Sequence, residues 1–456
     1  MTDAHFLSIA ERWQGRFDGR LWTREHEHYG AARQIWNGMI DRRPGLIARC
    51  ASVEDVVQAV KLAQVEGLPL SVRGGGHSVA GTAVCADGVM VDLSPMKDVG
   101  VNAARREIVA GPGTLWREFD VAAEKYGMAT TGGQVSHTGI AGLTLGGGLG
   151  YLMGKHGAVC DNLLSVEMVT AQGEVITASE ETNAELFWAM RGAGGNFGVV
   201  TAFRYRLHPL PGVLAGLLLH PRERTGELIA FYREYLKGTP DELDTTLGFL
   251  NAPDGSPLVG VVVVWAGDIA EGEEVLRPLR QFGPPVADMI QPMPYTAVQS
   301  MLDAAVPTGN RYYWKSNFGD TLSDELGDVL KRGADAMASP LSLILLFEIK
   351  GAIRRVPKES MAFDHREPHF EMSIIANWTD PAADSANIGW ARDLWTAAQP
   401  YVSRAVYANH MPQDEPVERV RASYGEAKFA KLAALKAKYD PANLFCSNHN
   451  IPPLGS

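Results

Sequence analysis

Cysteine is scarce in this chain of 456 residues, which has only Cys50, Cys85, Cys160 and Cys446. Their spacing fits neither a zinc site nor a disulfide framework, so we expect reduced thiols and no bound metal. The sequence also lacks an apolar run long enough to span a bilayer, and its start lacks a basic segment followed by an apolar one. We therefore expect a cytoplasmic protein with no membrane partner.

Basic residues are fewer than acidic ones, with 42 lysines and arginines against 53 aspartates and glutamates, and the net charge is -11. Because no basic patch stands out along the chain, the sequence argues against nucleic acid as a partner. The composition is that of a globular protein. A chain of this length is expected to form two domains, each of which buries its own apolar surface.

The apolar pattern changes near the segment His208-Pro-Leu-Pro, which we interpret as a domain boundary. Before it, short strands alternate with turns and helices, and Ser52 is expected to cap one of these helices. After it, longer strands predict an antiparallel sheet in an α+β domain, at residues 258–265, 312–318, 341–350 and 370–378. The spacing of alanine, leucine and lysine in residues 424–439 predicts a final helix.

Glycine is abundant, with 48 residues, and the functional argument depends on its clusters around Gly74, Gly146 and Gly194. The first cluster, Ser71-Val-Arg-Gly-Gly-Gly-His-Ser, follows an apolar strand, and its glycines allow positive φ angles and close approach of the main chain. Successive amides in such a turn form an anion-binding nest. His77 directly follows this nest and is positioned to meet a ring system that the anion carries.

Three interpretations of these clusters are open from the residues alone. A Rossmann dinucleotide site fits poorly, because Glu167 lies at the expected distance but begins a strand instead of ending one. Tight turns that bind nothing would explain a single cluster better than several within one domain. The third interpretation is a large diphosphate cofactor that lies extended across the domain and contacts all the clusters through backbone amides.

Taken together, the motifs closely resemble the vanillyl-alcohol-oxidase flavoprotein superfamily, and within it the berberine-bridge-enzyme-like FAD-linked oxidases. The segments that carry the resemblance follow the family's order over nearly the whole chain: Arg73-Gly-Gly-Gly-His-Ser, Gly111-Pro-Gly, Ser136 to Gly150, Cys160-Asp-Asn-Leu, Arg191-Gly-Ala-Gly-Gly-Asn-Phe-Gly, Lys438 to Phe445 and Asn448-His-Asn-Ile.

The resemblance implies an α+β fold in which a PCMH-type FAD-binding domain of two subdomains is joined to a substrate domain, where helices cover an antiparallel sheet. It assigns residues 1–208 to the FAD-binding domain and residues 209–410 to the substrate-binding domain. Residues 411–456 are expected to form a C-terminal segment that returns to the FAD-binding domain.

The cofactor implied by the resemblance is FAD, bound covalently. In the family, the histidine at the position of His77 bonds to the 8α-methyl carbon of the flavin. A neutral imidazole is a suitable nucleophile for this 8α-histidyl link, and the alternative is a histidine that only hydrogen-bonds a turn. Some relatives have a second link from a cysteine, but Val135 occupies that position here, so a single link is expected.

The cofactor-binding residues implied by the resemblance come from all the glycine clusters and from the C-terminal segment. They are Arg73, Gly74, Gly75, Gly76, His77, Ser78, Gly139, Gly142, Gly146, Asp161, Asn162, Gly195, Val200 and Asn450. The loop from Arg73 to Ser78 corresponds to the one that cradles the pyrophosphate, and the others are expected around the pyrophosphate, ribose and adenine. Gly154 replaces an arginine that is usual in the family, which weakens any ion pair there.

Catalytic groups are expected in the substrate domain, because hydride transfer from an alcohol needs a base for the hydroxyl proton. Glu348 and Lys350 share one face of an otherwise apolar strand. Glu348 is either a pocket base or amine-binding anion, or the solvated end of that strand. Tyr313 alternates with Lys315 on another strand and is a further candidate.

Three more candidates are expected near the flavin ring, where relatives place such groups: His137, Tyr407 and Asn409. Glu371, Ser373 and Asn377 also share one face of a strand, which we attribute to a polar outer face. The catalytic glutamate of the plant branch aligns poorly with this chain, near Arg354 and Arg355, and is not transferred to it.

The function implied by the resemblance is that of an FAD-dependent oxidoreductase acting on a small molecule, expected to be an oxidase that passes electrons to dioxygen and forms hydrogen peroxide. The donor is either a secondary alcohol, such as a sugar or glycoside, or a cyclic amine of the 6-hydroxynicotine kind. A dehydrogenase with another acceptor and a non-catalytic flavoprotein are the alternatives, and the oligomeric state is open.

Overall fold

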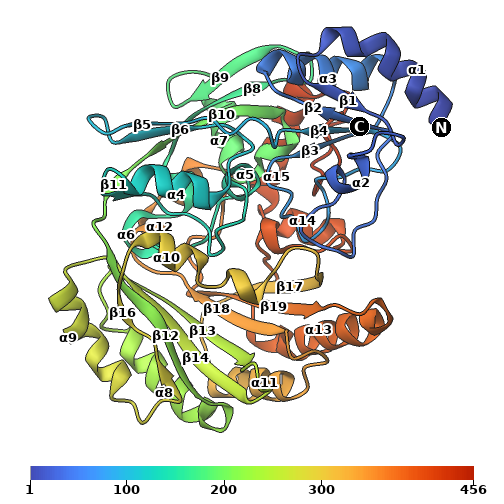
Figure 1. The fold of residues 1–456 in the computed structure, drawn as a ribbon. Helices are drawn as coiled ribbons and strands as arrows, with labels where there is room; N and C mark the ends of the chain where they lie inside the picture. Colours follow the sequence, from blue (N-terminus) through green and yellow to red (C-terminus); the bar gives the residue numbers. More distant parts are fainter. Residues whose placement is uncertain (1, 456) are drawn as a thin grey trace.

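A computed structural model describes residues 2–455, and its two halves lie one above the other in Figure 1. The first half holds a sheet with the strand order β1-β2-β4-β3 and a second sheet with the order β5-β6-β10-β8-β9. The strands of the first sheet are β1 (Arg20–Trp22), β2 (Leu46–Arg49), β3 (Leu70–Arg73) and β4 (Val89–Asp92). Those of the second are β5 (Val99–Asn102), β6 (Glu107–Ala110), β8 (Leu163–Val169), β9 (Val175–Ser179) and β10 (Val199–Arg206).

The glycine-rich loop follows a parallel β-α-β unit. Strands β2 and β3 both pair with β4 in parallel, and helix α3 (Val53–Val65) connects them. As expected, Ser52 caps α3: its side chain accepts a hydrogen bond from Asp55 N, and the Asp55 carboxylate accepts one from Ser52 N. This unit therefore delivers the loop at the carboxyl end of β3, where the main chain is free to bind a ligand.

The second half is built on one large antiparallel sheet with the strand order β15-β12-β14-β13-β18-β19-β17, in which β15 is the short edge strand Ala287–Asp288. Its long strands are β12 (Val213–Pro221), β13 (Leu243–Asn251), β14 (Pro257–Trp265), β17 (Arg311–Gly319), β18 (Leu343–Glu348) and β19 (Phe370–Trp378). The helices that pack on it are α8 (Thr225–Leu236), α9 (Ile269–Arg280), α11 (Asp324–Asp335) and α13 (Asp384–Ala398). The predicted α+β fold with a helix-covered antiparallel sheet is confirmed.

The two faces of this sheet have different neighbours, because successive side chains of a strand point to opposite sides. One face packs against the helices through residues such as Leu247, Ile344 and Met372. The other face packs against the first half of the chain, where Phe347 and Ile375 belong to clusters shared with its loops. Any cavity between the halves is therefore bordered by only every second residue of each strand.

The C-terminal segment returns to the first half of the molecule (Figure 1). Helices α14 (Val417–Ala422) and α15 (Glu426–Tyr439) share a hydrophobic core with α7 (Ala184–Ala193). At the end of α15, the buried Lys436 pairs with Asp440 at 2.6 Å and donates a hydrogen bond to the carbonyl of Asn196 at 2.7 Å. Within residues 2–455, no helix has both the length and the apolar character needed to cross a membrane.

Candidate active site

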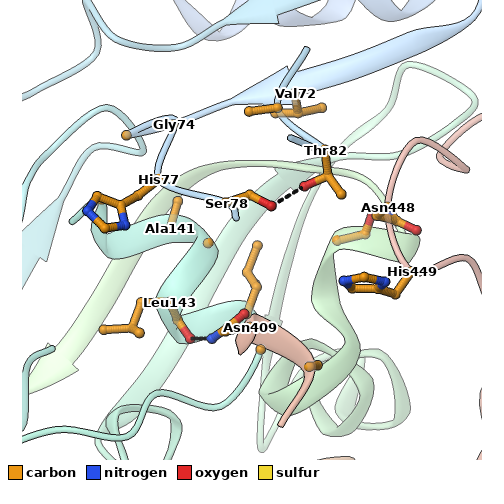
Figure 2. A pocket seen from close by; sticks show the side chains of 18 of the residues that line it. Val72, Gly74, His77, Ser78, Thr82, Ala141, Leu143, Asn409, Asn448 and His449 are labelled. Carbon is orange, nitrogen blue, oxygen red and sulfur yellow. Dashed lines mark hydrogen bonds between the residues drawn. The ribbon is translucent and has the colours of Figure 1, made fainter. Parts of the chain in front are cut away.

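A cavity of about 320 Å³ lies where the glycine loops, the C-terminal segment and strand β17 meet. Its walls include residues after β3, helix α5 (Ile140–Leu145), the end of α7, the start of β10 and residues 445 and 447–449. Figure 2 shows His77 at one end, with Asn448 and His449 at the other and α5 between them. The cavity is thus elongated, and backbone groups from several distant segments border it.

Several glycines that line this cavity leave no room for side chains. A Cβ atom on Gly74 would lie 2.8 Å from the carbonyl oxygen of Pro112, and one on Gly75 would lie 2.5 Å from the Cα of Gly139. A Cβ on Gly146 would overlap the side-chain amide of Asn409. Gly76 has a φ of +69°, which L-residues rarely adopt. Backbone atoms around Gly74, Gly75, Gly76 and Gly146 therefore form this part of the cavity surface, which we call the glycine cradle.

His77 lies at one end of this cradle in an aromatic stack. Its ring lies 4.3 Å from that of Trp36 at an interplanar angle of 18°, and Trp36 stacks in turn on Tyr312 at 3.7 Å. Nε2 of His77 shares a hydrogen bond of 3.0 Å with Nδ1 of His137. Burial, together with the neighbouring His137, lowers the pKa of His77 to about 3, so its imidazole is neutral at physiological pH.

The opposite end of the cavity contains polar atoms that lack partners within residues 2–455. Asn448 lines the cavity and donates a hydrogen bond to the carbonyl of Gly195 at 2.6 Å, but its Oδ1 is buried and unpaired. The buried Oδ1 of Asn450 is also unpaired among the described residues, although Asn450 is not in the cavity wall. Buried polar groups normally have partners. An extended ligand with hydroxyl groups, such as FAD, would donate hydrogen bonds to these amide oxygens, so the residues fit FAD.

Most of the expected cofactor-binding residues line the cavity: Gly74, Gly75, Gly76, His77, Ser78, Gly139, Gly142, Gly146, Gly195 and Val200. Asp161 instead forms a buried pair with Arg366, at 2.6 and 2.7 Å. Asn162 donates hydrogen bonds to the carbonyls of His156 and Ala158, at 3.0 and 3.1 Å. Arg73 donates to the carbonyl of Ala32. The side chains of Arg73, Asp161 and Asn162 are therefore engaged within the protein.

The cavity does not include Glu348, Lys350 or Tyr313 in its walls. Glu348 is 9% exposed and therefore not solvated; it accepts a hydrogen bond from Thr245 at 2.7 Å and lies 3.3 Å from Lys350 Nζ. Burial raises the pKa of the Glu348 carboxyl. Tyr313 belongs to the helix-covered core and donates a hydrogen bond to Asp414 at 2.9 Å. Strand alternation turns these side chains away from the first half of the chain.

The same alternation turns Glu371 toward the cavity, although we had attributed this residue to a polar outer face. Glu371, Ser373 and Asn377 are 0%, 1% and 0% exposed, so the expectation of a polar outer face is wrong. His410 lines the cavity, and its Nδ1 lies 3.0 Å from Glu371 Oε1 and 2.9 Å from Ser373 Oγ. The ring of Trp314, also in the wall, meets His410 edge to face at 5.0 Å.

This group of Glu371, Ser373 and His410 was missed by sequence reasoning. Glu371 and Ser373, two positions apart in a strand whose other polar residue is Asn377, were the available signal. Whether such a pair faces solvent or a buried site depends on what covers the sheet, which the strand itself does not encode.

Tyr407 and Asn409 support the second glycine run. The Tyr407 hydroxyl accepts hydrogen bonds from the amides of Gly148 and Leu149 at 2.9 and 3.2 Å, and from Asn409 Nδ2 at 2.8 Å. Asn409 also donates to the carbonyl of Leu143 at 3.1 Å, as Figure 2 shows. Burial raises the pKa of Tyr407, so its hydroxyl stays protonated. Of the two side chains, Asn409 lines the main cavity.

Comparisons with known proteins agree with this geometry. A family model described as an FAD binding domain matches residues 44–179, and one described as berberine and berberine like matches residues 406–452. The chain is 32% identical over 443 residues to an FAD-linked oxidoreductase of Dictyostelium discoideum, with 96% of this chain and 95% of the relative covered. It is also 32% identical over 447 residues to (R)-6-hydroxynicotine oxidase of Paenarthrobacter nicotinovorans, with 94% and 95% covered.

A solved structure shows the same fold. The crystal structure of 6-hydroxy-D-nicotine oxidase from Arthrobacter nicotinovorans matches with a TM-score of 0.87 at 29% identity, and the match covers 95% of this chain and 98% of that one. The relatives match over nearly their whole length, and both family segments contribute residues to the cavity. The resemblance read from the glycine motifs is therefore confirmed, and the chain belongs to the berberine-bridge-enzyme-like family of FAD-linked oxidoreductases.

Proposed function

We propose that this protein is an oxidase that removes a hydride from a small-molecule donor, using FAD bonded through a single link to His77, and that dioxygen is the electron acceptor. The observation that carries the proposal is that His77 and His410, the latter hydrogen-bonded to the buried Glu371, border one cavity. The flavin supplies the hydride acceptor and the reaction with dioxygen. The chain supplies the groups that bind the cofactor, the histidine that attaches it and a proton acceptor.

The groups proposed to bind the cofactor belong to the main chain. Gly74, Gly75 and Gly76 border a cavity whose wall contains no lysine or arginine, so their backbone amides are the proposed donors to phosphate, as in anion-binding nests. Val135 lines the same cavity where some relatives carry a thiol. Because valine offers no nucleophile, one covalent link through His77 is the proposed attachment.

His410 is the proposed proton acceptor. Its Nδ1 is held by Glu371 and Ser373, which fixes the ring and leaves Nε2 to take a proton. The buried carboxylate of Glu371 stabilises the imidazolium that results, as an acidic residue does beside a catalytic histidine. Oxidation of an alcohol needs such a base for the hydroxyl proton, so a secondary alcohol is the first candidate donor.

A cyclic amine is the second candidate donor. Trp314 borders the cavity next to His410, and its buried Nε1 has no partner among residues 2–455. An indole face suits a flat or cationic ring, and one relative at 32% identity is named (R)-6-hydroxynicotine oxidase. A neutral amine can lose hydride without a base, so His410 would position this donor more than activate it.

Anaerobic mixing of the purified protein with sugars, other secondary alcohols and cyclic amines tests the proposal. A true donor bleaches the flavin, and admission of air then restores the yellow colour with release of hydrogen peroxide. Bleaching that air does not reverse would indicate a dehydrogenase with another acceptor. Flavin that stays oxidised with every donor of both classes would remove the support for an oxidase.

A further inference from the structure

The segment that places His137 against His77 is fixed by a contact between parts of the chain that are distant in sequence. It lies just before α5, and its neighbour Ser136 donates from its amide and hydroxyl to Asp303, at 2.9 and 2.6 Å. Asp303 comes from the substrate half of the chain, in the turn Asp303–Ala305. This contact fixes the segment in which His137 meets His77 at 3.0 Å.

The charged groups around His137 have opposing effects on its protonation. The carboxylate of Asp303 favours its imidazolium, whereas Arg117 and burial oppose it, and burial is the largest influence on its lowered pKa. His77 is the titratable group in direct contact. His137 is therefore neutral before the reaction, and its Nδ1 faces the imidazole ring of His77.

Attachment of a flavin to a histidine requires a base. When one nitrogen of a neutral imidazole forms a bond to carbon, the ring becomes a cation until the other nitrogen loses its proton. Burial and the neighbouring His137 disfavour a cationic His77, as its lowered pKa shows, so the proton needs an acceptor within reach. The hydrogen bond between His77 Nε2 and His137 Nδ1 supplies such an acceptor at the required position.

We propose that His137 is the base for covalent flavin attachment: it removes the Nε2 proton of His77 while Nδ1 of His77 bonds to the 8α-carbon of FAD. This inference rests on the covalent link in the proposed function. One C–H bond of the 8α-methyl group and the N–H bond of His77 break, and one C–N bond forms. The electron pair passes to the flavin ring, two protons are released, one of them through His137, and dioxygen reoxidises the flavin to give hydrogen peroxide.

The test follows attachment, not turnover. Full-length wild-type and His137→Gln proteins are produced under riboflavin limitation and mixed with FAD, and the flavin that stays on the chain after acid precipitation is measured over time. Glutamine keeps a hydrogen bond to His77 but cannot accept a proton. We expect attachment about 10²-fold slower, in the range of general base catalysis, when both proteins are compared at FAD concentrations that saturate them.

Two further measurements separate a base from a structural contact. Added imidazole should restore attachment in His137→Ala, and the wild-type attachment rate should rise with pH through the ionisation of His137, whereas the rate of His137→Gln should not. His156→Gln is the matched control, because His156 is another half-buried histidine, with a pKa lowered to about 3, and its ring stacks on His208 at 3.8 Å and not on His77. This control should attach flavin at the wild-type rate.

The outcomes distinguish this inference from the function on which it rests. If wild type attaches flavin and His137→Gln does so equally fast, the role of His137 is overturned and the covalent oxidase stands. A pH-independent wild-type rate would overturn it too, even if the variants fold poorly. If wild type itself retains no flavin after acid precipitation, both the covalent link and the inference are wrong.

Discussion

The glycine cradle and the β17–β19 face border the same cavity but are built in opposite ways. In the cradle the main chain makes the surface, and an added Cβ at Gly75 or Gly146 would meet other atoms. On the sheet face, side chains make the surface, and the polar ones are held by each other, as Glu371, Ser373 and His410 are. The cradle therefore depends on the absence of side chains, and the sheet face depends on which side chains alternate toward the cavity.

The largest effect should come from the polar group on the sheet face. We expect His410→Ala to slow anaerobic flavin reduction by an alcohol donor about 10² to 10³-fold, because the hydroxyl proton loses its acceptor. Glu371→Gln should slow it less, since the imidazole remains. Stopped-flow bleaching of the holoenzyme measures both.

The matched control for that pair is Glu348→Gln, a buried glutamate on the helix-covered face of the same sheet. Its flavin reduction rate should equal that of wild type. If Glu348→Gln slowed reduction as much as Glu371→Gln, the assignment of the two faces would be wrong.

The next effect concerns the cradle. Gly75→Ala would place a Cβ 2.5 Å from the Cα of Gly139, and backbone atoms cannot move aside cheaply. We expect a loss of stability of about 1–3 kcal/mol, as in overpacked sites, together with reduced FAD content. Chemical denaturation and the flavin-to-protein absorbance ratio report the two effects.

Gly226→Ala is the control for this substitution, because Gly226 is exposed in α8 and nothing lies within 4 Å of its added Cβ. It should gain about 0.5–1 kcal/mol from the better helix former and keep its full FAD content. Equal losses in the two variants would mean that crowding does not shape the cradle.

A pH effect is expected at the border between the two halves. Asp120 of α4 (Trp116–Glu124) accepts a hydrogen bond from Gln299 of α10 (Tyr295–Ser300) at 3.0 Å, and burial raises the pKa of its carboxyl to about 8. The folded state thus holds a proton that the unfolded state loses at lower pH. Stability should therefore fall as the pH rises from the unfolded pKa toward 8, by up to about 1.4 kcal/mol per pH unit.

Asp120→Asn cannot lose this proton and should not show that part of the pH dependence. The difference between the unfolding free energies of wild type and variant, measured by denaturation at several pH values, isolates the effect of this carboxyl. A difference that stays constant with pH would show that Asp120 is ionised in the folded protein.

The smallest effect is expected for Tyr313→Phe. The lost hydroxyl donates to Asp414 and accepts from Arg392 at 3.1 Å, outside the cavity. We expect a loss of about 1 kcal/mol in stability, typical of one hydrogen bond, and no change in the rate of flavin reduction. A slower reduction would place Tyr313 closer to the chemistry than its position on the helix-covered face suggests.

The cradle could be predicted from the sequence because its requirements are local. Gly76 has a left-handed φ, and Gly74 and Gly75 lie close to neighbouring backbone atoms. In each case only glycine satisfies the requirement. For this reason the glycine run, together with the histidine after it, indicated the cofactor and the family.

The sheet face could not be predicted in the same way. Period-two alternation groups Glu348 with Lys350, and Glu371 with Ser373, but it does not say which group faces the first half of the chain. The answer depends on the helices α8, α11 and α13, which cover one face through the tertiary fold. No sequence pattern pairs His410 with Glu371, because only the tertiary fold brings His410 against β19.

The central claim is that a flavin lies in this cavity with its ring end at His77, and peptide mapping tests it most directly. Purified protein is precipitated with acid and digested, and the fluorescent peptide is identified by mass. We expect a yellow precipitate and a single flavin-bearing peptide that contains His77. A colourless protein that does not take up added FAD, or a flavin found on a peptide from another segment, would contradict it.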